Sequence, residues 1–139
     1  MGANRIDSEG LEAVVEILRT QLPDLEFAYL FGSAARGDAT RSSDVDIAVR
    51  AGHRIDAVTR FRLQEAIAAR LGCDVDLIDL ASASTVLRVQ VLSDGRVFFE
   101  RHPIERERFE MNVLSAYARL NEERRDILED VRHRGTVHG

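Results

Sequence analysis

Short apolar runs of strand type alternate along this chain with longer amphipathic segments of helical type. Apolar residues recur every three or four positions in the helical segments, and they lie next to one another in the strand segments. This alternation predicts an α/β or α+β fold in which helices flank a sheet. Helices are expected over about residues 8–22, 55–71, 84–92 and 104–131, and strands over about residues 26–31, 44–49, 75–80 and 96–100.

The ends of the predicted helices carry capping residues. Asp7 or Ser8 can cap the first helix, and Ser82 or Ser84 can cap the third. Gly72 stands where a helix that ends in a left-handed residue would place a glycine. These local signals set the expected boundaries to within a few residues.

The 139 residues fit one domain. We expect a core over about residues 7–100 and a C-terminal helical region over about residues 104–131, formed by one long helix or two. The apolar positions of that region recur at helical spacing, and its other faces carry dense Glu and Arg. These apolar positions are Phe109, Val113, Tyr117, Leu120, Ile127 and Val131.

Composition excludes several classes of protein. The net charge of −5 argues against direct nucleic-acid binding by charge alone. No apolar run approaches the length that spans a bilayer, and the polar start of the chain does not resemble a signal peptide. The single cysteine, Cys73, cannot form an intrachain disulfide and is expected to be a small core residue. We therefore expect a cytoplasmic protein without a membrane partner.

Gly32 and Ser33 follow the first apolar strand segment. A glycine lets a ligand approach the backbone closely, and backbone N–H groups at a helix start bind phosphate. A hydroxyl at Ser33 would add a further donor. Taken alone the signal is weak, because Gly-Ser is common in turns.

Asp44 and Asp46 lie two residues apart at the start of the second strand segment, so both side chains would project from one face. Two adjacent carboxylates repel each other unless a cation lies between them, and Mg²⁺ prefers such oxygen ligands. In that register Val45 and Ile47 would face the core. For an isolated Asp-x-Asp the alternative is a solvated strand end.

A third carboxylate would complete a site for two metal ions. The segment at residues 73–80 offers Asp74, Asp76 and Asp79. Asp76 is the preferred candidate, because a carboxylate between apolar strand residues is costly to bury without a partner or a metal. Asp74 is the second choice, and Asp79 could instead cap a helix or form a turn.

The pattern G-S-x-A-R-G-D at residues 32–38, followed by S-D-x-D-I at residues 43–47, resembles the signature of the minimal nucleotidyltransferases of the DNA polymerase β superfamily. V-D-L at residues 75–77 is similar to the strand that carries the third carboxylate of that family. The resemblance implies a mixed sheet with flanking helices. The charged C-terminal helix around Tyr117 is more weakly similar to the antitoxin members that accompany a HEPN-domain toxin.

The resemblance also implies roles for single residues. Gly32 and Ser33 would hold the triphosphate, and Arg36 is either a phosphate contact or a loop-stabilising arginine. Two Mg²⁺ ions would be held by Asp44, Asp46 and Asp76. Asp76 would also help to activate the acceptor hydroxyl, which attacks the α-phosphorus and releases pyrophosphate.

The acceptor is less strongly specified than the chemistry. Little chain follows the core, so we expect a partner to supply the acceptor, and the resemblance suggests a hydroxyl of a HEPN-family toxin RNase with ATP as donor. Two alternatives stay open: a binding module that neutralises the toxin by contact, and a nucleotidyltransferase that acts on a small molecule such as an antibiotic.

Overall fold

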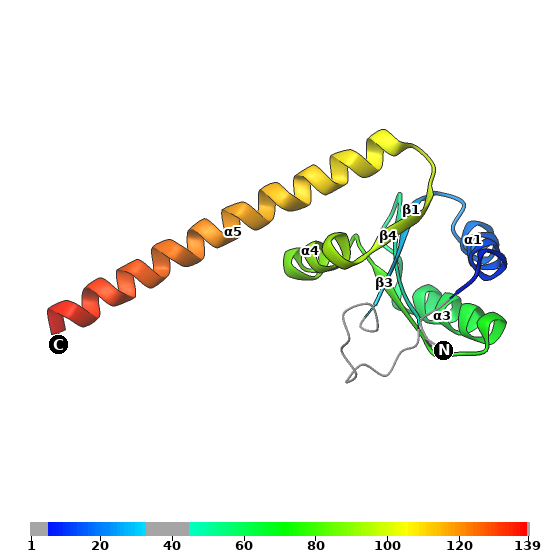
Figure 1. Ribbon diagram of the computed structural model, residues 1–139, viewed down its shortest axis with the longest axis horizontal. Coiled ribbons are helices and arrows are strands. Elements are labelled where there is room, and N and C mark those ends of the chain that lie inside the picture. Colours follow the sequence, from blue (N-terminus) through cyan, green and yellow to red (C-terminus); the bar gives the residue numbers. More distant parts are fainter. Residues whose placement is uncertain (1–5, 33–44, 139) are drawn as a thin grey trace.

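The computed structural model describes residues 6–32 and 45–138, with side chains described as far as residue 133. Helices and strands alternate along this part of the chain, as Figure 1 shows, which confirms the predicted mixed fold class. The elements are α1 (Ser8–Gln21), β1 (Leu25–Phe31), β2 (Val45–Ala51), α3 (Ala57–Leu71), β3 (Val75–Asp79), α4 (Thr85–Asp94), β4 (Arg96–Glu100) and α5 (Pro103–His138).

The helix ends follow the local capping signals. The Asp7 side chain caps α1 by accepting a hydrogen bond from the Gly10 N–H at 2.8 Å. Ser84, rather than Ser82, caps α4 by accepting one from the Leu87 N–H at 3.1 Å. Gly72 ends α3 with a φ of 74°, a left-handed conformation that glycine adopts at little cost.

Within the described residues, four strands form one mixed sheet in the order β3-β2-β1-β4. β1 pairs antiparallel with both β2 and β4, whereas β2 and β3 run parallel. The α3 helix connects β2 to β3, which is the long connection that a parallel pair requires. β2 therefore lies inside the sheet, and β3 forms an edge.

The two faces of the sheet are covered by different helices (Figure 1). Val45 and Ile47 of β2 belong to an apolar cluster with α1 and α3, so they face the core as predicted. The half-buried Cys73 packs against the same cluster. On the opposite face, aromatic residues of β1 pack with α4 and the first part of α5.

The C-terminal region is one continuous helix, α5, which extends to His138 and so passes the expected end at residue 131. No proline follows Val131, and a single glycine at residue 135 lowers helix propensity without ending the helix. Figure 1 shows that only the first part of α5 lies on the body and that the remainder projects away from it. No helix in the described ranges is long and apolar enough to cross a membrane.

Candidate active site

The parallel pairing of β2 with β3 places two carboxylates side by side. Asp46 and Asp76 are direct register partners. Residues paired in this way project from the same face of a sheet, and neighbouring strands lie roughly 5 Å apart. Asp46 is only 2% exposed, whereas Asp76 is half-buried on the edge strand. The long-range register thus joins two residues that are thirty positions apart in the sequence.

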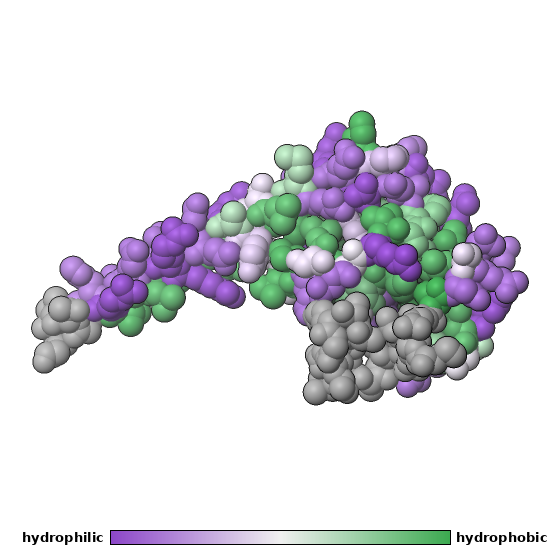
Figure 2. Space-filling view, viewed as in Figure 1, coloured by the Kyte–Doolittle hydropathy of each residue, from purple (hydrophilic) through white to green (hydrophobic). Residues whose placement is uncertain are grey.

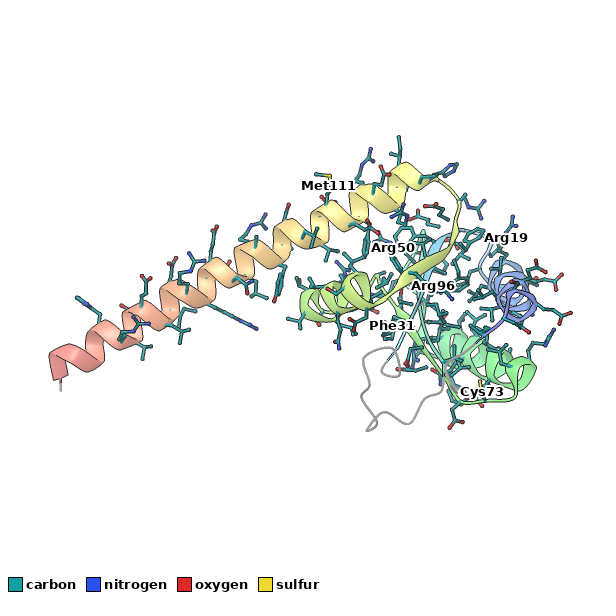
Figure 3. All side chains as sticks on the ribbon, viewed as in Figure 1. Arg19, Phe31, Arg50, Cys73, Arg96 and Met111 are labelled. Carbon is teal, nitrogen blue, oxygen red and sulfur yellow. The ribbon has the colours of Figure 1, made fainter. Side chains whose placement is uncertain are left out.

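Gly32 completes the described part of the site. Phe31, the last residue of β1, pairs with Asp46, so Gly32 follows directly beside that carboxylate; Figure 3 labels Phe31 at this end of the sheet. A Cβ atom at Gly32 would lie 2.8 Å from Asp46 Oδ2. Only a residue without a side chain fits there unless the carboxylate moves. We expected this glycine to admit a ligand, and the structure adds that it makes room for Asp46.

The other predicted ligands lie outside the described residues. Ser33, Arg36 and Asp44 belong to the segment between β1 and β2, so their predicted contacts with phosphate and metal stay predictions. Asp44 immediately precedes β2 in sequence. Across the described ranges, no cluster of three or more His, Cys, Asp or Glu side chains is arranged to hold a metal ion.

Asp79, a candidate for the third carboxylate, has a structural role instead. It is 4% exposed, and its register partner is Val49. Its Oδ2 accepts from the Ile55 N–H at 2.9 Å and from the Ser82 hydroxyl at 3.3 Å. Its Oδ1 accepts from the Ala81 N–H at 3.0 Å. These bonds join the chain before α3 to the turn after β3, in agreement with the turn role considered for this residue.

Asp74 differs from Asp76 in its position. It is exposed and precedes β3, and its backbone carbonyl accepts a hydrogen bond from the Val45 N–H at 3.1 Å. Asp76 lies within the strand, directly beside Asp46. The geometry therefore favours Asp76 over Asp74 as the partner of Asp46.

A polar network anchors α5 to the sheet face that carries Asp46. The Tyr29 hydroxyl donates to Glu110 Oε2 at 2.5 Å, and Arg106 donates to the same oxygen at 2.8 Å and to Glu100 Oε1 at 2.6 Å. Burial, followed by the bond to Glu110, raises the pKa of Tyr29 well above its usual value. The two carboxylates raise the pKa of Arg106. This network was not predictable from the sequence, because Tyr29 lies in an apolar strand and has the appearance of an ordinary core residue.

Two arginines contact the ring of Phe109, a buried residue near the start of α5, on the sheet face that carries Asp46. Arg50 lies over the Phe109 ring with its guanidinium carbon 5.5 Å from the ring centroid, and Arg88 lies at 5.6 Å. Arg88 also donates to the backbone carbonyls of Leu80 and Ala81 at 2.8 and 3.0 Å. Burial lowers the pKa of Arg88, and the charge of Arg50 lowers it further. The start of α5 is therefore held by stacking as well as by hydrogen bonds.

The sequence matches the model of a known family of enzymes. The family model described as polymerase beta, nucleotidyltransferase, matches residues 12–104, which include every element from most of α1 to β4. The chain belongs to the polymerase β family of nucleotidyltransferases. The matched range contains Gly32, Asp46 and Asp76 as well as the predicted ligands between β1 and β2.

This nucleotidyltransferase is similar to proteins of toxin–antitoxin pairs. It is 41% identical over 118 residues to the protein adenylyltransferase MntA of Shewanella oneidensis, a match that spans 85% of this chain and 84% of the relative. A solved structure of the tri-AMPylated Shewanella oneidensis HEPN toxin in complex with MNT antitoxin matches with a TM-score of 0.76 and 36% identity, over 91% of this chain and 98% of the other. A crystal structure of a toxin–antitoxin with AMP-PNP matches with a TM-score of 0.75 and 40% identity, over 87% and 97%.

Proposed function

We propose that this nucleotidyltransferase is an antitoxin that transfers AMP from ATP to a hydroxyl group of a HEPN-family toxin in the cytoplasm. The observation that carries the proposal is the register of Asp46 beside Asp76, next to a glycine whose Cβ would crowd the Asp46 carboxylate. The similarity to an adenylyltransferase and to a complex with a tri-AMPylated toxin supports the choice of donor and acceptor. The single cysteine is in keeping with a reducing compartment.

The chemistry of the donor set fits Mg²⁺. Asp46 and Asp76 offer hard carboxylate oxygens on one face of the sheet, and a buried carboxylate beside another is costly unless a cation compensates the charge. We assign Asp44, Asp46 and Asp76 as the metal ligands. Two bound Mg²⁺ ions would lower the pKa of the attacking hydroxyl and neutralise the leaving pyrophosphate.

The residues of this chain then act by binding and positioning. Gly32, Ser33 and Arg36 would hold the triphosphate at the end of β1. Asp76 is half-buried on the edge strand, so its carboxylate is the more accessible of the described pair and can receive the proton of the acceptor hydroxyl. The acceptor oxygen forms a bond to the α-phosphorus as the bond from that phosphorus to the bridging oxygen breaks, and pyrophosphate leaves.

The test is to incubate the full chain with ATP, Mg²⁺ and a HEPN-family toxin from the same organism, and then to measure the intact mass of that toxin. Each transfer adds one AMP group, and Asp46→Asn should add none. The toxin's RNase activity, measured in parallel, should fall with the wild type and persist with Asp46→Asn. An unmodified toxin that both forms inhibit equally would indicate neutralisation by contact. An unmodified and uninhibited toxin would leave transfer to a small molecule.

A further inference from the structure

No other element of the described chain buries the second half of α5. Phe109 and Val113 are 7% and 2% exposed and pack against the sheet. Tyr117 and Leu120 are half-buried, and every residue from 122 to 133 is exposed. Figure 1 shows this part of the helix projecting from the body, and we call residues 117–131 the arm.

The apolar stripe that packs on the body continues along the arm. From Val113 the stripe positions follow one another at alternating steps of four and three residues, which is the spacing of a helix–helix seam. At roughly 100° per residue, all of these positions lie within about 60° of the direction in which Val113 points. They are Tyr117, Leu120, Arg124, Ile127 and Val131, with Leu128 at the margin.

The end of the stripe is the most exposed part. Ile127 and Leu128 are each 62% exposed and Val131 is 57% exposed. Figure 2 shows apolar residues along the lower edge of the projecting helix, among polar neighbours. A helix that lacks tertiary contacts is only marginally stable in water, and contiguous exposed apolar residues on it are typical of a contact surface.

The charges along the stripe argue against a second copy of this chain as the molecule that packs on it. Arg124 occupies a seam position, so a parallel pair of arms would place two Arg124 side chains face to face. Glu123 and Asp130 flank the stripe on one side. An antiparallel pair would bring this acidic flank against the acidic flank of the other copy. Both arrangements place like charges in contact, whereas a partner of a different sequence can avoid them.

We infer that the arm is the docking surface for the toxin, and that it receives an amphipathic helix of the toxin with an apolar stripe and basic residues facing Glu123 and Asp130. This inference rests on the proposed function. The solved structure of a HEPN toxin in complex with an MNT antitoxin, which matches 91% of this chain, supports the kind of partner, and the exposed stripe and its charges support the surface.

The position of the arm relative to the site gives the docking a role. The base of α5 packs on the sheet face that carries Asp46, through Phe109 and Val113 and through the bond between Tyr29 and Glu110. A toxin held by the arm would therefore be tethered on the side of the sheet where transfer occurs. Such tethering raises the local concentration of the acceptor without changing the chemical step. The arm should thus affect the KM for the toxin and not kcat.

The experiment compares two variants of the full chain. In Ile127→Ser/Val131→Ser the stripe loses two apolar side chains, and serine has a helix propensity close to those of isoleucine and valine. The matched control is Met111→Ser. Met111 is 69% exposed, lies about 160° around the helix from Val113, and points away from the body in Figure 3. Helix content measured by circular dichroism should be the same for all three proteins.

The readouts are the Kd for the HEPN-family toxin from the same organism, measured by calorimetry, and the kinetics of AMP transfer to that toxin. We expect the double variant to raise Kd and KM by about tenfold or more with kcat unchanged at saturating toxin, and Met111→Ser to match the wild type. A double variant that binds like the wild type would overturn the inference, and so would a wild-type dimer in light scattering that the double variant abolishes. A loss of binding in the double variant, with no AMP transfer by any form, would support the arm and reject the proposed function.

Discussion

Gly32→Ala tests the geometry of the site with one methyl group. The new Cβ would lie 2.8 Å from Asp46 Oδ2, whereas ordinary van der Waals contact for a Cβ begins at 3.4 Å, so it would be too close by at least 0.6 Å. Gly72 is the only described glycine with a positive φ, so an alanine can adopt the backbone conformation of Gly32. Asp46 lies on an interior strand with paired neighbours on both sides. The carboxylate, and not the strand, must therefore move.

The displacement sets the size of the effect. Catalytic groups must be held within about 0.5 Å of their productive positions, and an error of about 1 Å costs roughly a hundredfold in rate. We expect Gly32→Ala to lower kcat for AMP transfer by about 10- to 100-fold, which corresponds to about 1.4–2.7 kcal/mol in the barrier. Crowding of a well-packed site should lower the free energy of unfolding by about 1–3 kcal/mol. The variant should thus stay folded at 25 °C.

Gly72→Ala is the matched control. It should strain the backbone without crowding any side chain, whereas Gly32→Ala should crowd a carboxylate without straining the backbone. Gly72 has a φ of 74°, and a Cβ there would meet no atom within 4 Å. Alanine in that conformation costs about 1–2 kcal/mol of stability without touching the site. The assays are urea unfolding and the rate of AMP addition by intact mass, at saturating ATP and Mg²⁺. Transfer by Gly32→Ala within twofold of the wild type would refute the steric argument, and so would an equal loss of kcat in Gly72→Ala.

Three further substitutions separate charge, structure and pH effects. Asp46→Asn should reduce AMP transfer by about 10²-fold or more, yet its Tm in EDTA should equal or exceed that of the wild type, because repulsion from Asp76 falls. Asp79→Asn should lower the free energy of unfolding in urea by about 1–3 kcal/mol, with transfer per folded molecule unchanged, because it replaces one carboxylate oxygen that accepts a backbone N–H with an amide donor. His53→Gln removes the ion pair with Asp24, in which the bond to Asp24 raises the pKa of His53 and the bond to His53 lowers that of Asp24. The Tm of this variant should fall furthest below that of the wild type between about pH 4 and pH 6.5. The difference in Tm should shrink as the pH rises through the raised pKa of His53, and also as the pH falls through the lowered pKa of Asp24. A difference that stays constant with pH would reject this assignment.

Local signals predicted the strands and most helix ends well, although α5 extends beyond its predicted end. The strand at residues 96–100 has the predicted bounds, and Gly72 ends α3 as expected. These features depend on residues within one or two helical turns of each other. An example is a capping side chain, which accepts a hydrogen bond from a backbone N–H two or three residues later. Local signals do not decide among Asp74, Asp76 and Asp79, because that choice depends on which strand pairs with β2 and in which register.

Long-range packing decided the features that the sequence left unresolved. The spacing of apolar residues in the C-terminal region predicted a stripe, but spacing does not say how far the sheet extends beneath it. Phe109 and Val113 are buried, whereas Ile127 and Val131 are exposed on the same side of the helix. The contact between Gly32 and Asp46 was likewise not predictable, since it joins the ends of two strands through their antiparallel register.

The two buried aspartates of this sheet, which project from opposite faces, show how a fold distinguishes a structural carboxylate from one that we propose binds metal. Asp46 and Asp79 are 2% and 4% exposed and belong to neighbouring parallel strands. Asp79 lies beside Val49 and accepts bonds from two backbone N–H groups, so its negative charge is compensated by the chain itself. Asp46 lies beside another carboxylate, and the repulsion between two such charges is a cost that a bound cation would reduce. Such a local conflict within an otherwise consistent fold is expected where function, rather than stability, determines the residue.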